Sequence, residues 1–144
     1  MAKVQVELPE HFNFTTEIPI RISDINYGGH VGNDAILTLA HEARVQFLKK
    51  AGYGELNIEG IGSIITDAAI EYKGEMFYGD TVIVSIKAMN FSKIGFELYY
   101  KMEKETDKGK MLIAKIKTAI LGYDYSKKKI ANIPEIAATK ISAL

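Results

Sequence analysis

Hydrophobic and polar residues alternate along this chain with two different periods, and these periods predict where strands and helices form. Ile18, Ile20 and Ile22 alternate with polar neighbours over Thr15–Ser23, which predicts a half-buried strand. Pro19 has no backbone N–H group, so we expect this strand near a sheet edge or a break in pairing. Farther along, a two-residue period and many β-branched residues predict four strands, at Gly62–Lys73, Thr81–Phe91, Gly95–Glu103 and Lys110–Asp124.

Between the first strand and the others, the segment Asp34–Ala51 has the spacing of a long helix. Asn33 or Asp34 is placed to act as its N-cap, and two lysines and a glycine are typical of its far end. The first half is apolar around most of its circumference, which predicts a helix covered on nearly every side. A short terminal helix is also expected, with Pro134 in its first turn.

The order of these elements favours an α+β fold. Short turns join the four later strands, which predicts an antiparallel meander, and a sheet of about five strands wrapped around one long central helix fits the pattern. We expect a single domain over residues 1–144, in which residues 1–14, interrupted by Pro9, form a poorly specified arm. Because such a sheet has exposed edges, we expect a homodimer and its further assembly into a homotetramer.

Composition and charge narrow the possible partners. The chain has 18 basic and 18 acidic residues, so its balanced charge gives no general reason to expect nucleic-acid or anionic-membrane binding. It contains no cysteine, which excludes disulfides and a cysteine nucleophile and fits a reducing compartment. No apolar leader or membrane-spanning run is present, so we expect a cytoplasmic protein.

The stretch SDINYGGHVGND, residues 23–34, concentrates the polar and flexible residues of the chain just before the long helix. It holds three glycines, four Asp or Asn residues and one histidine. One interpretation is a turn that leads a strand into a buried helix. The other is a substrate-binding loop, because Gly28, Gly29 and Gly32 permit close approach of a ligand and the N–H groups at a helix start can bind an oxyanion.

Two segments carry a resemblance to a known family. The run RISDINYGGHVGNDAILTLAHEARVQFLKKAGY resembles the loop and helix of the hot-dog-fold acyl-CoA thioesterases, the 4-hydroxybenzoyl-CoA thioesterase-like group, and IEYKGEMFYGDTVIVSI resembles its later strands. This resemblance implies the hot-dog fold and hydrolysis of an acyl-CoA thioester to free acid and CoA. It implies no cofactor other than the CoA carried by the substrate. The loop motif is matched at five positions, Asp24, Gly29, His30, Val31 and Asn33.

Two positions of the loop depart from the family pattern. Asn26 stands where the family usually has a catalytic Asp, and Gly32 replaces the first Asn of the motif. The Asp attacks the thioester carbonyl or activates a water, and an amide can do neither. Asn26 could instead orient a water or donate to the thioester oxygen, and the resemblance places the oxyanion donor at the backbone N–H near Asn33.

Three side chains are candidates for the missing catalytic group, and each has a structural alternative. Glu42 lies mid-helix, in the segment that we expect to be most buried, where another branch of these thioesterases carries its carboxylate. Alternatively, it pairs with Arg44, Lys49 or a loop amide. His30 could act as a base or hydrogen-bond the loop into shape. Asp34 could act as a base at the cleft mouth or serve as the N-cap.

The remaining candidates are binding residues. We expect Tyr27 to line the cleft or pack on a partner subunit, and Thr66 and Asp67 to contribute from the second subunit of a dimer. A two-residue period cannot decide whether Asp67 points into the site or to solvent. His41 has no second histidine at metal-ligand spacing, so no metal site is expected.

The leading hypothesis is therefore an acyl-CoA thioesterase. Asn26 motivates an alternative, a hot-dog protein that binds acyl thioesters or other small ligands without hydrolysing them. Dehydration of hydroxyacyl thioesters comes third, because the helix motif and histidine geometry of hot-dog dehydratases are not matched.

Overall fold

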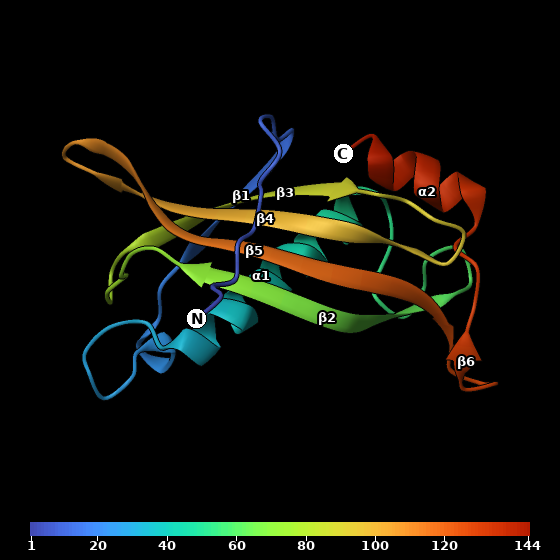
Figure 1. The fold of residues 1–144 in the computed structure, drawn as a ribbon, viewed down its shortest axis with the longest axis horizontal. Helices are drawn as coiled ribbons and strands as arrows, with labels where there is room; N and C mark the ends of the chain where they lie inside the picture. Colours follow the sequence, from blue (N-terminus) through green and yellow to red (C-terminus); the bar gives the residue numbers. More distant parts are fainter.

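One long helix, α1, lies against the concave face of a twisted antiparallel sheet (Figure 1). The structure is a computed structural model that describes residues 1–144. The helices are α1 (Asn33–Lys50) and α2 (Glu135–Ser142), with a short 3-10 turn at Ile22–Asp24. The strands are β1 (Phe14–Pro19), β2 (Gly62–Tyr72), β3 (Thr81–Met89), β4 (Gly95–Thr106), β5 (Gly109–Asp124) and the short β6 (Lys129–Ile130). The predicted α+β architecture is confirmed, with five main strands and one long helix.

The predicted meander of four strands is wrong in one connection. The strand order is β1-β3-β4-β5-β2, so only β3, β4 and β5 follow one another, and β2 pairs with β5 at the far edge. Residues 73–80 carry the chain from β2 at one edge of the sheet to β3, which lies beside β1 at the other edge. Met76, in the middle of this connection, is buried, and its carbonyl accepts a hydrogen bond of 2.9 Å from the Val31 N–H. The crossover therefore also supports the segment that leads into α1.

The first strand is shorter than predicted. β1 lies at a sheet edge, as Pro19 indicated, but it ends at that proline and is followed by the 3-10 turn. Ile18 and Ile20 are buried, whereas Ile22 is 72% exposed because the strand period has ended before it. The predicted strand over Thr15–Ser23 is thus correct only in its first part.

The prediction that α1 is covered on nearly every side is wrong for the single chain. Its sheet-facing side is buried, with Leu39, Ala43 and Phe47 at 2% exposure or less. The opposite side is open, and Leu37 and Val45 there are 41% and 43% exposed. A groove of about 470 Å³ runs between this open side and β1. The apolar circumference of α1 therefore exceeds what one sheet covers, as expected when a second surface packs on it.

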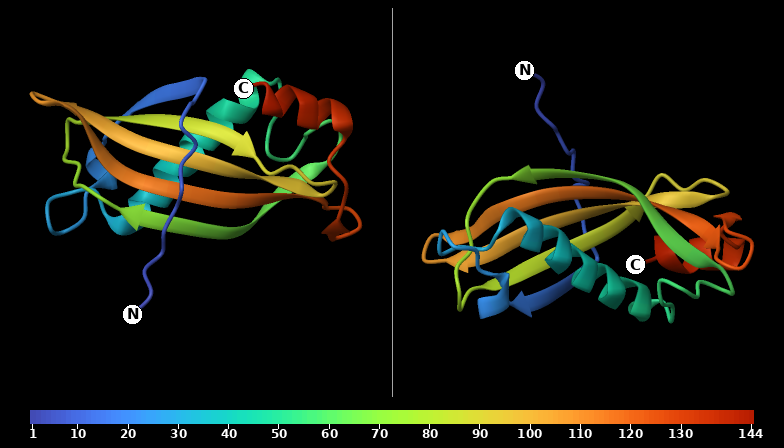
Figure 2. Two further views of the ribbon diagram at one scale, coloured as in Figure 1. Left: turned by 45° about the horizontal axis from the view of Figure 1, so that its top comes forward. Right: turned by 90° about the horizontal axis from the view of Figure 1, so that it is seen from below.

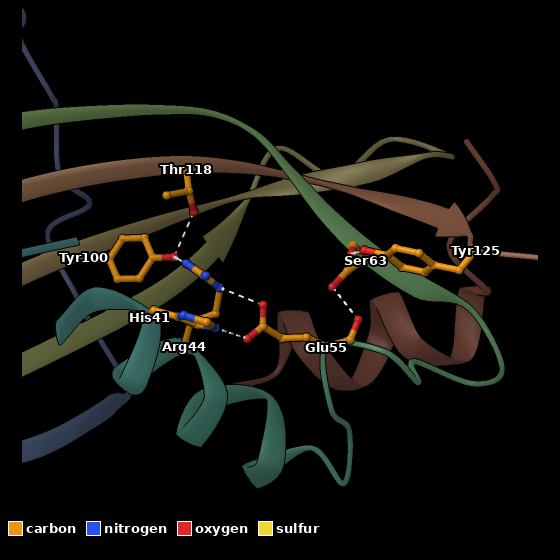
Figure 3. Close-up of polar contacts among 7 residues, drawn as sticks. All are labelled: His41, Arg44, Glu55, Ser63, Tyr100, Thr118 and Tyr125. Carbon is orange, nitrogen blue, oxygen red and sulfur yellow. Dashed lines mark hydrogen bonds and ion pairs between the residues drawn. The ribbon is translucent and has the colours of Figure 1, made fainter. Parts of the chain in front are cut away.

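A buried arginine ties α1 to three other parts of the fold (Figure 3). Arg44 is 7% exposed, and its Nη1 donates to the Tyr100 hydroxyl on β4 at 3.1 Å. That hydroxyl also lies 2.8 Å from Oγ1 of Thr118 on β5, and burial raises the pKa of Tyr100. Nε of Arg44 lies 3.5 Å from Oε2 of Glu55, and Nε2 of His41 lies 2.6 Å from the other oxygen of that carboxylate.

The two chain ends lie on the sheet. The N-terminal arm crosses the convex face, opposite α1 (Figure 2), and Val6 is 4% exposed there, with its N–H donating to Glu71 at 2.5 Å. Phe12 in the same arm stacks with the Lys101 ammonium, 5.1 Å from the ring centre. At the other end, α2 forms as predicted, with Pro134 as its N-cap residue and Ile141 buried.

The Arg44 contacts predict a specific loss of stability. Tyr100→Phe removes the hydroxyl that accepts from Arg44 and leaves Nη1 of Arg44 and Oγ1 of Thr118 without these partners in a buried site. We expect the free energy of unfolding in urea to fall by about 1 to 2 kcal/mol. Tyr99→Phe is the matched control, because its hydroxyl bonds Glu97 on the opposite, partly exposed face and its loss should cost at most about 0.5 kcal/mol. Equal effects of the two changes would contradict the assigned role.

Candidate functional site

The glycine-rich stretch forms a closed loop between the 3-10 turn and α1. Ile25 and Val31 pair as an isolated antiparallel bridge, and Asn26 donates its N–H to the His30 carbonyl at 2.9 Å. At the tip, the Gly29 N–H donates to the Asn26 carbonyl at 3.1 Å, and Gly29 has a φ of +85°. This conformation is disfavoured for residues with a side chain, so the tip depends on glycine.

Asp24 anchors the base of this loop. Its side chain is buried, and Oδ2 accepts the Arg21 N–H at 2.8 Å. The Asp24 carbonyl accepts the Gly32 N–H at 3.2 Å, which closes the loop at the start of α1. The first Asp of the family motif therefore has a structural task in this chain.

The first turn of α1 has no side-chain cap. Gly32 is the N-cap residue, so the prediction that Asn33 or Asp34 caps the helix is wrong. The N–H groups of Asn33 and Asp34 have no acceptor within the chain, and both side chains are exposed. The carbonyl of Asn33 accepts the Tyr72 hydroxyl at 3.1 Å, which fixes the helix start against the end of β2. Two N–H donors and the positive end of the helix dipole are thus available to an anion or a carbonyl oxygen.

Three predicted site residues meet beside this helix start. A Cβ atom placed on Gly28 would lie 3.2 Å from Oδ1 of Asn26 and 3.6 Å from Nε2 of His30. A Cβ atom on Gly32 would lie 2.6 Å from Oδ1 of Asp34 and 3.7 Å from Nδ2 of Asn26. The Asn26 amide therefore lies near both the imidazole and the carboxylate. A side chain at Gly32 would displace the exposed Asp34 carboxylate.

The other polar contacts of Asn26, His30 and Asp34 leave the Asn26 Nδ2 group and the Asp34 carboxylate without hydrogen-bond partners. Oδ1 of Asn26 accepts the Gly28 N–H at 2.9 Å, an arrangement that leaves its Nδ2 group available as a donor. Nδ1 of His30 lies 3.1 Å from the Val31 carbonyl, which can only accept, so this nitrogen carries the proton. Nε2 of His30 lies 3.9 Å from Glu75. No hydrogen bond or ion pair engages the Asp34 carboxylate.

Glu42 does not join this group within the chain. It lies nine residues after Asn33 on α1, about 13 Å along the helix at 1.5 Å per residue. The expectation that Glu42 is buried is wrong, since it is exposed, and its Oε2 accepts from Gln46 at 2.8 Å. Glu42 lines the groove between α1 and β1, together with Thr38 and His41.

The three expected binding residues outside this group, Tyr27, Thr66 and Asp67, are all exposed in the single chain. Tyr27 is fully exposed, as is expected of a residue that covers a cleft only when a second surface is present. Thr66 is exposed at an irregularity of β2, between Ile65 and Asp67. Asp67 pairs with Lys117 at 3.0 Å on the sheet face away from α1, so the solvent-facing alternative holds for Asp67.

Sequence reasoning missed two groups that hold the loop in place. The Tyr72 hydroxyl could have been suspected, because a tyrosine ends the strand within the family-like stretch IEYKGEM. The Met76 carbonyl, which accepts from Val31, has no signal in the sequence, since every residue supplies a backbone carbonyl. No group of three or more His, Asp or Glu side chains is placed to hold a metal ion. No helix is long and apolar enough to cross a membrane.

The fold and this loop define a hot-dog protein of the thioesterase type, and comparison with known proteins agrees. Residues 20–141 match the model of the Thioesterase-like superfamily, and the chain belongs to this family. The resemblance seen in the sequence is thereby confirmed. A search of curated protein sequences finds no match.

Solved structures share the fold over nearly their whole length. A 1,4-dihydroxy-2-naphthoyl-CoA thioesterase from Synechocystis is 22% identical with a TM-score of 0.80, covering 91% of this chain and 96% of its own. A DHNA-CoA thioesterase from Staphylococcus aureus is 24% identical with a TM-score of 0.78, covering 90% and 91%. An aspartate-to-asparagine mutant of 4-hydroxybenzoyl-CoA thioesterase, complexed with 4-hydroxybenzoyl-CoA, is 17% identical with a TM-score of 0.80, covering 90% and 98%. Similarity at these identities shows the hot-dog fold.

The loop tip predicts the effect of a glycine replacement. Gly29→Val forces a β-branched residue into a positive φ, which should cost about 1 to 2 kcal/mol of loop stability and misplace Asn26 and His30. Gly54→Val is the matched control, because Gly54 also has open space around it but no positive φ. Hydrogen exchange of the loop amides should quicken only in Gly29→Val. Similar exchange in both variants would show that the tip tolerates a side chain.

Proposed function

We propose that this protein hydrolyses acyl-CoA thioesters to a free acid and CoA. The observation that carries the proposal is the open start of α1, where two unpaired N–H groups stand next to a free carboxylate in a chain of the Thioesterase-like superfamily. Thioester hydrolysis needs a donor for the carbonyl oxygen and a group that activates water. Both are present within the first two residues of one helix.

The geometry supports a role for each group in the reaction. The thioester oxygen accepts hydrogen bonds from the N–H groups of Asn33 and Asp34, which stabilise the negative charge as water adds to the carbonyl carbon. The Asp34 carboxylate takes one proton from that water. The carbon–sulfur bond then breaks, the CoA thiolate takes the proton from Asp34, and the acid is released.

Asn26 then acts as an orienting group and not as the base. Its Nδ2 faces the Asp34 side of the loop and can donate to the attacking water or to the thioester oxygen. His30, whose Nδ1 donates to the Val31 carbonyl, has its ring near Asn26 as well. In this scheme the carboxylate has moved from the loop position of the family to the first turn of the helix.

A homodimer is part of the proposal. β1 is a short edge strand of six residues that ends at Pro19, whereas β2 is an edge strand of eleven residues. The backbone of β2 is therefore the better edge for antiparallel pairing with a second copy. In a symmetric pairing over the whole strand, Thr66 of the partner subunit lies opposite Ala68, near the middle of β2.

Three other expectations stay proposals. We infer further assembly of dimers into a tetramer, a cytoplasmic location in keeping with the absence of cysteine, and chemistry without a cofactor beyond the CoA of the substrate. The balanced charge supports a small-molecule partner over nucleic acid or a membrane surface.

A second function is favoured by one residue. Asn26 replaces the family carboxylate, so the chain could bind acyl thioesters without cleaving them. Calorimetry with a non-hydrolysable CoA thioether, run beside a thiol-release assay, separates the two functions. Binding without release of thiol from any aliphatic or aromatic acyl-CoA would favour the binding protein and overturn the hydrolase.

The assignment of the base predicts opposite results for two carboxylates. Asp34→Asn should lower kcat by about a hundredfold in the thiol-release assay, because the amide cannot take the proton from water. Glu42→Gln should change kcat by less than about twofold, since Glu42 lies about 13 Å along the helix from the open N–H groups. The reverse result would assign the base to Glu42 and require it to reach the site from another subunit.

Because Asn26 replaces the catalytic Asp of the family, restoring that Asp should increase activity. Asn26→Asp restores the family carboxylate while keeping the acceptor for the Gly28 N–H, and kcat should rise by about tenfold or more. Asn57→Asp is the matched control, because the Asn57 side chain also accepts a backbone N–H of a nearby glycine, that of Gly60 at 2.8 Å. His30→Ala should lower the rate at least about tenfold. An unchanged rate in Asn26→Asp would mean that Asp34 already supplies the full base function.

A further inference from the structure

The N-terminal arm crosses the convex face of the sheet, on the side opposite α1, and reaches β2 (Figure 2). There the Val6 N–H donates to Oε1 of Glu71 at 2.5 Å. Val6 is 4% exposed, whereas Val4 is 54% exposed, so the arm is held on the sheet as far as Glu71. The arm lies outside residues 20–141, which match the family model. Its contact with β2 is therefore not part of the matched region.

The Glu71 carboxylate joins the arm to the end of β2. One oxygen accepts the Val6 N–H, and the other lies 3.1 Å from Nζ of Lys73, the first residue after the strand. The side chain is only 15% exposed. The Val6 N–H, followed by the Lys73 ammonium, lowers the pKa of Glu71, so the carboxylate is charged at neutral pH. Both of its oxygens are thus occupied at the point where the strand ends.

The residues that follow this glutamate hold two supports of the site. Tyr72 is next in the strand, so its side chain lies on the other face, where its hydroxyl donates to the Asn33 carbonyl at 3.1 Å. The crossover that begins after it supplies the Met76 carbonyl, which accepts the Val31 N–H at 2.9 Å. Within one chain this end of β2 pairs only with β5. Because the ends of edge strands open readily, both supports depend on what holds this end in place.

We propose that Glu71 is a positioning residue of the thioester site, through which the N-terminal arm holds the end of β2 and thereby the start of α1. This inference rests on the proposed function. The arm and the Glu71 carboxylate lie on the convex face, whereas the open N–H groups of Asn33 and Asp34 lie on the side of α1. Glu71 therefore acts through the strand and not on the substrate. A displacement of about 1 Å in groups that receive a reacting carbonyl can lower a rate about a hundredfold.

Replacement of Glu71 tests its effect on the reaction. Glu71→Ala removes the acceptor of the Val6 N–H, and kcat in the thiol-release assay should fall about tenfold. KM should change by less than about twofold, because the displaced N–H donors act mainly in the transition state. Glu71→Gln keeps an oxygen that can accept the Val6 N–H, so it should retain more than about half of kcat.

Glu103→Ala is the matched control for this change. Glu103 is 16% exposed and pairs with Lys101 at 3.8 Å, but it lies on β4 and accepts no N–H group from the arm. Its removal changes the charge in the same way and should leave kcat within about twofold. Equal losses in Glu71→Ala and Glu103→Ala, or no recovery in Glu71→Gln, would overturn the proposal.

A double variant tests whether Glu71 acts through the arm. Val6→Pro removes the same hydrogen bond from the donor side, because proline has no backbone N–H, and kcat should fall to a similar extent. Val4→Pro, at an exposed position of the same arm, should have no effect. Val6→Pro combined with Glu71→Ala should be no slower than Glu71→Ala alone, since both changes remove one contact. Losses that multiply would assign Glu71 a role independent of the arm and contradict the proposal.

Hydrogen exchange tests the same contact without any need for hydrolysis. The amides of Val31 and Ala35 are hydrogen-bonded at the start of α1. Both should exchange about fivefold faster or more in Glu71→Ala and in Val6→Pro, while amides of the central strands β3 and β4 keep their rates. Unchanged exchange at the helix start would rule out the positioning role. Faster exchange there, with no hydrolysis by any form of the protein, would contradict the proposed function and support the hold of Glu71 on the helix start.

Discussion

The position of α1 depends on the burial of one charged side chain. Arg44 is removed from water, so the fold must bring an acceptor and an opposite charge to it. Tyr100 on a central strand accepts from its Nη1, and Glu55 supplies the negative charge from the segment after the helix, although Nε itself has no hydrogen-bond partner. Thr118 on β5 holds the Tyr100 hydroxyl in place. These contacts fix where the helix lies on the sheet and therefore where its first turn opens.

The site follows from what the first turn of α1 lacks. Gly32 cannot cap the helix with a side chain, and Asp34 makes no capping bond, so two N–H groups remain unsatisfied where Asn26 and His30 converge. Unsatisfied donors cost stability at a helix end, but they form an oxyanion site when a carbonyl approaches. The less stable helix start is thus also a place where negative charge can be stabilised. Other contacts hold this region in place, from the Tyr72 hydroxyl to Asn33 and from Val31 to the Met76 carbonyl of the buried crossover.

Periodicity predicted the secondary structure well because each strand and helix buries one regular face. The predicted strand order was wrong because β2 and β3 follow one another along the chain but are not paired. Residues 73–80 cross the sheet from β2 to β3, which lies beside β1. The loop residues were predicted from the motif, and Asn26, His30 and Asp34 do converge. The cap assignment of Asp34 and the burial of Glu42 were wrong, because one sequence cannot reveal which side of an apolar helix a second surface would cover.

The open side of α1 affects how this protein behaves when it is diluted. Leu37 and Val45 stay in water in an isolated chain, together with the fully exposed ring of Tyr27. Association that hides these groups couples folding to mass action, so the apparent melting temperature rises with protein concentration. Thermal stability is then a property of the assembled protein, and a measurement in dilute solution reports mainly on the solitary chain.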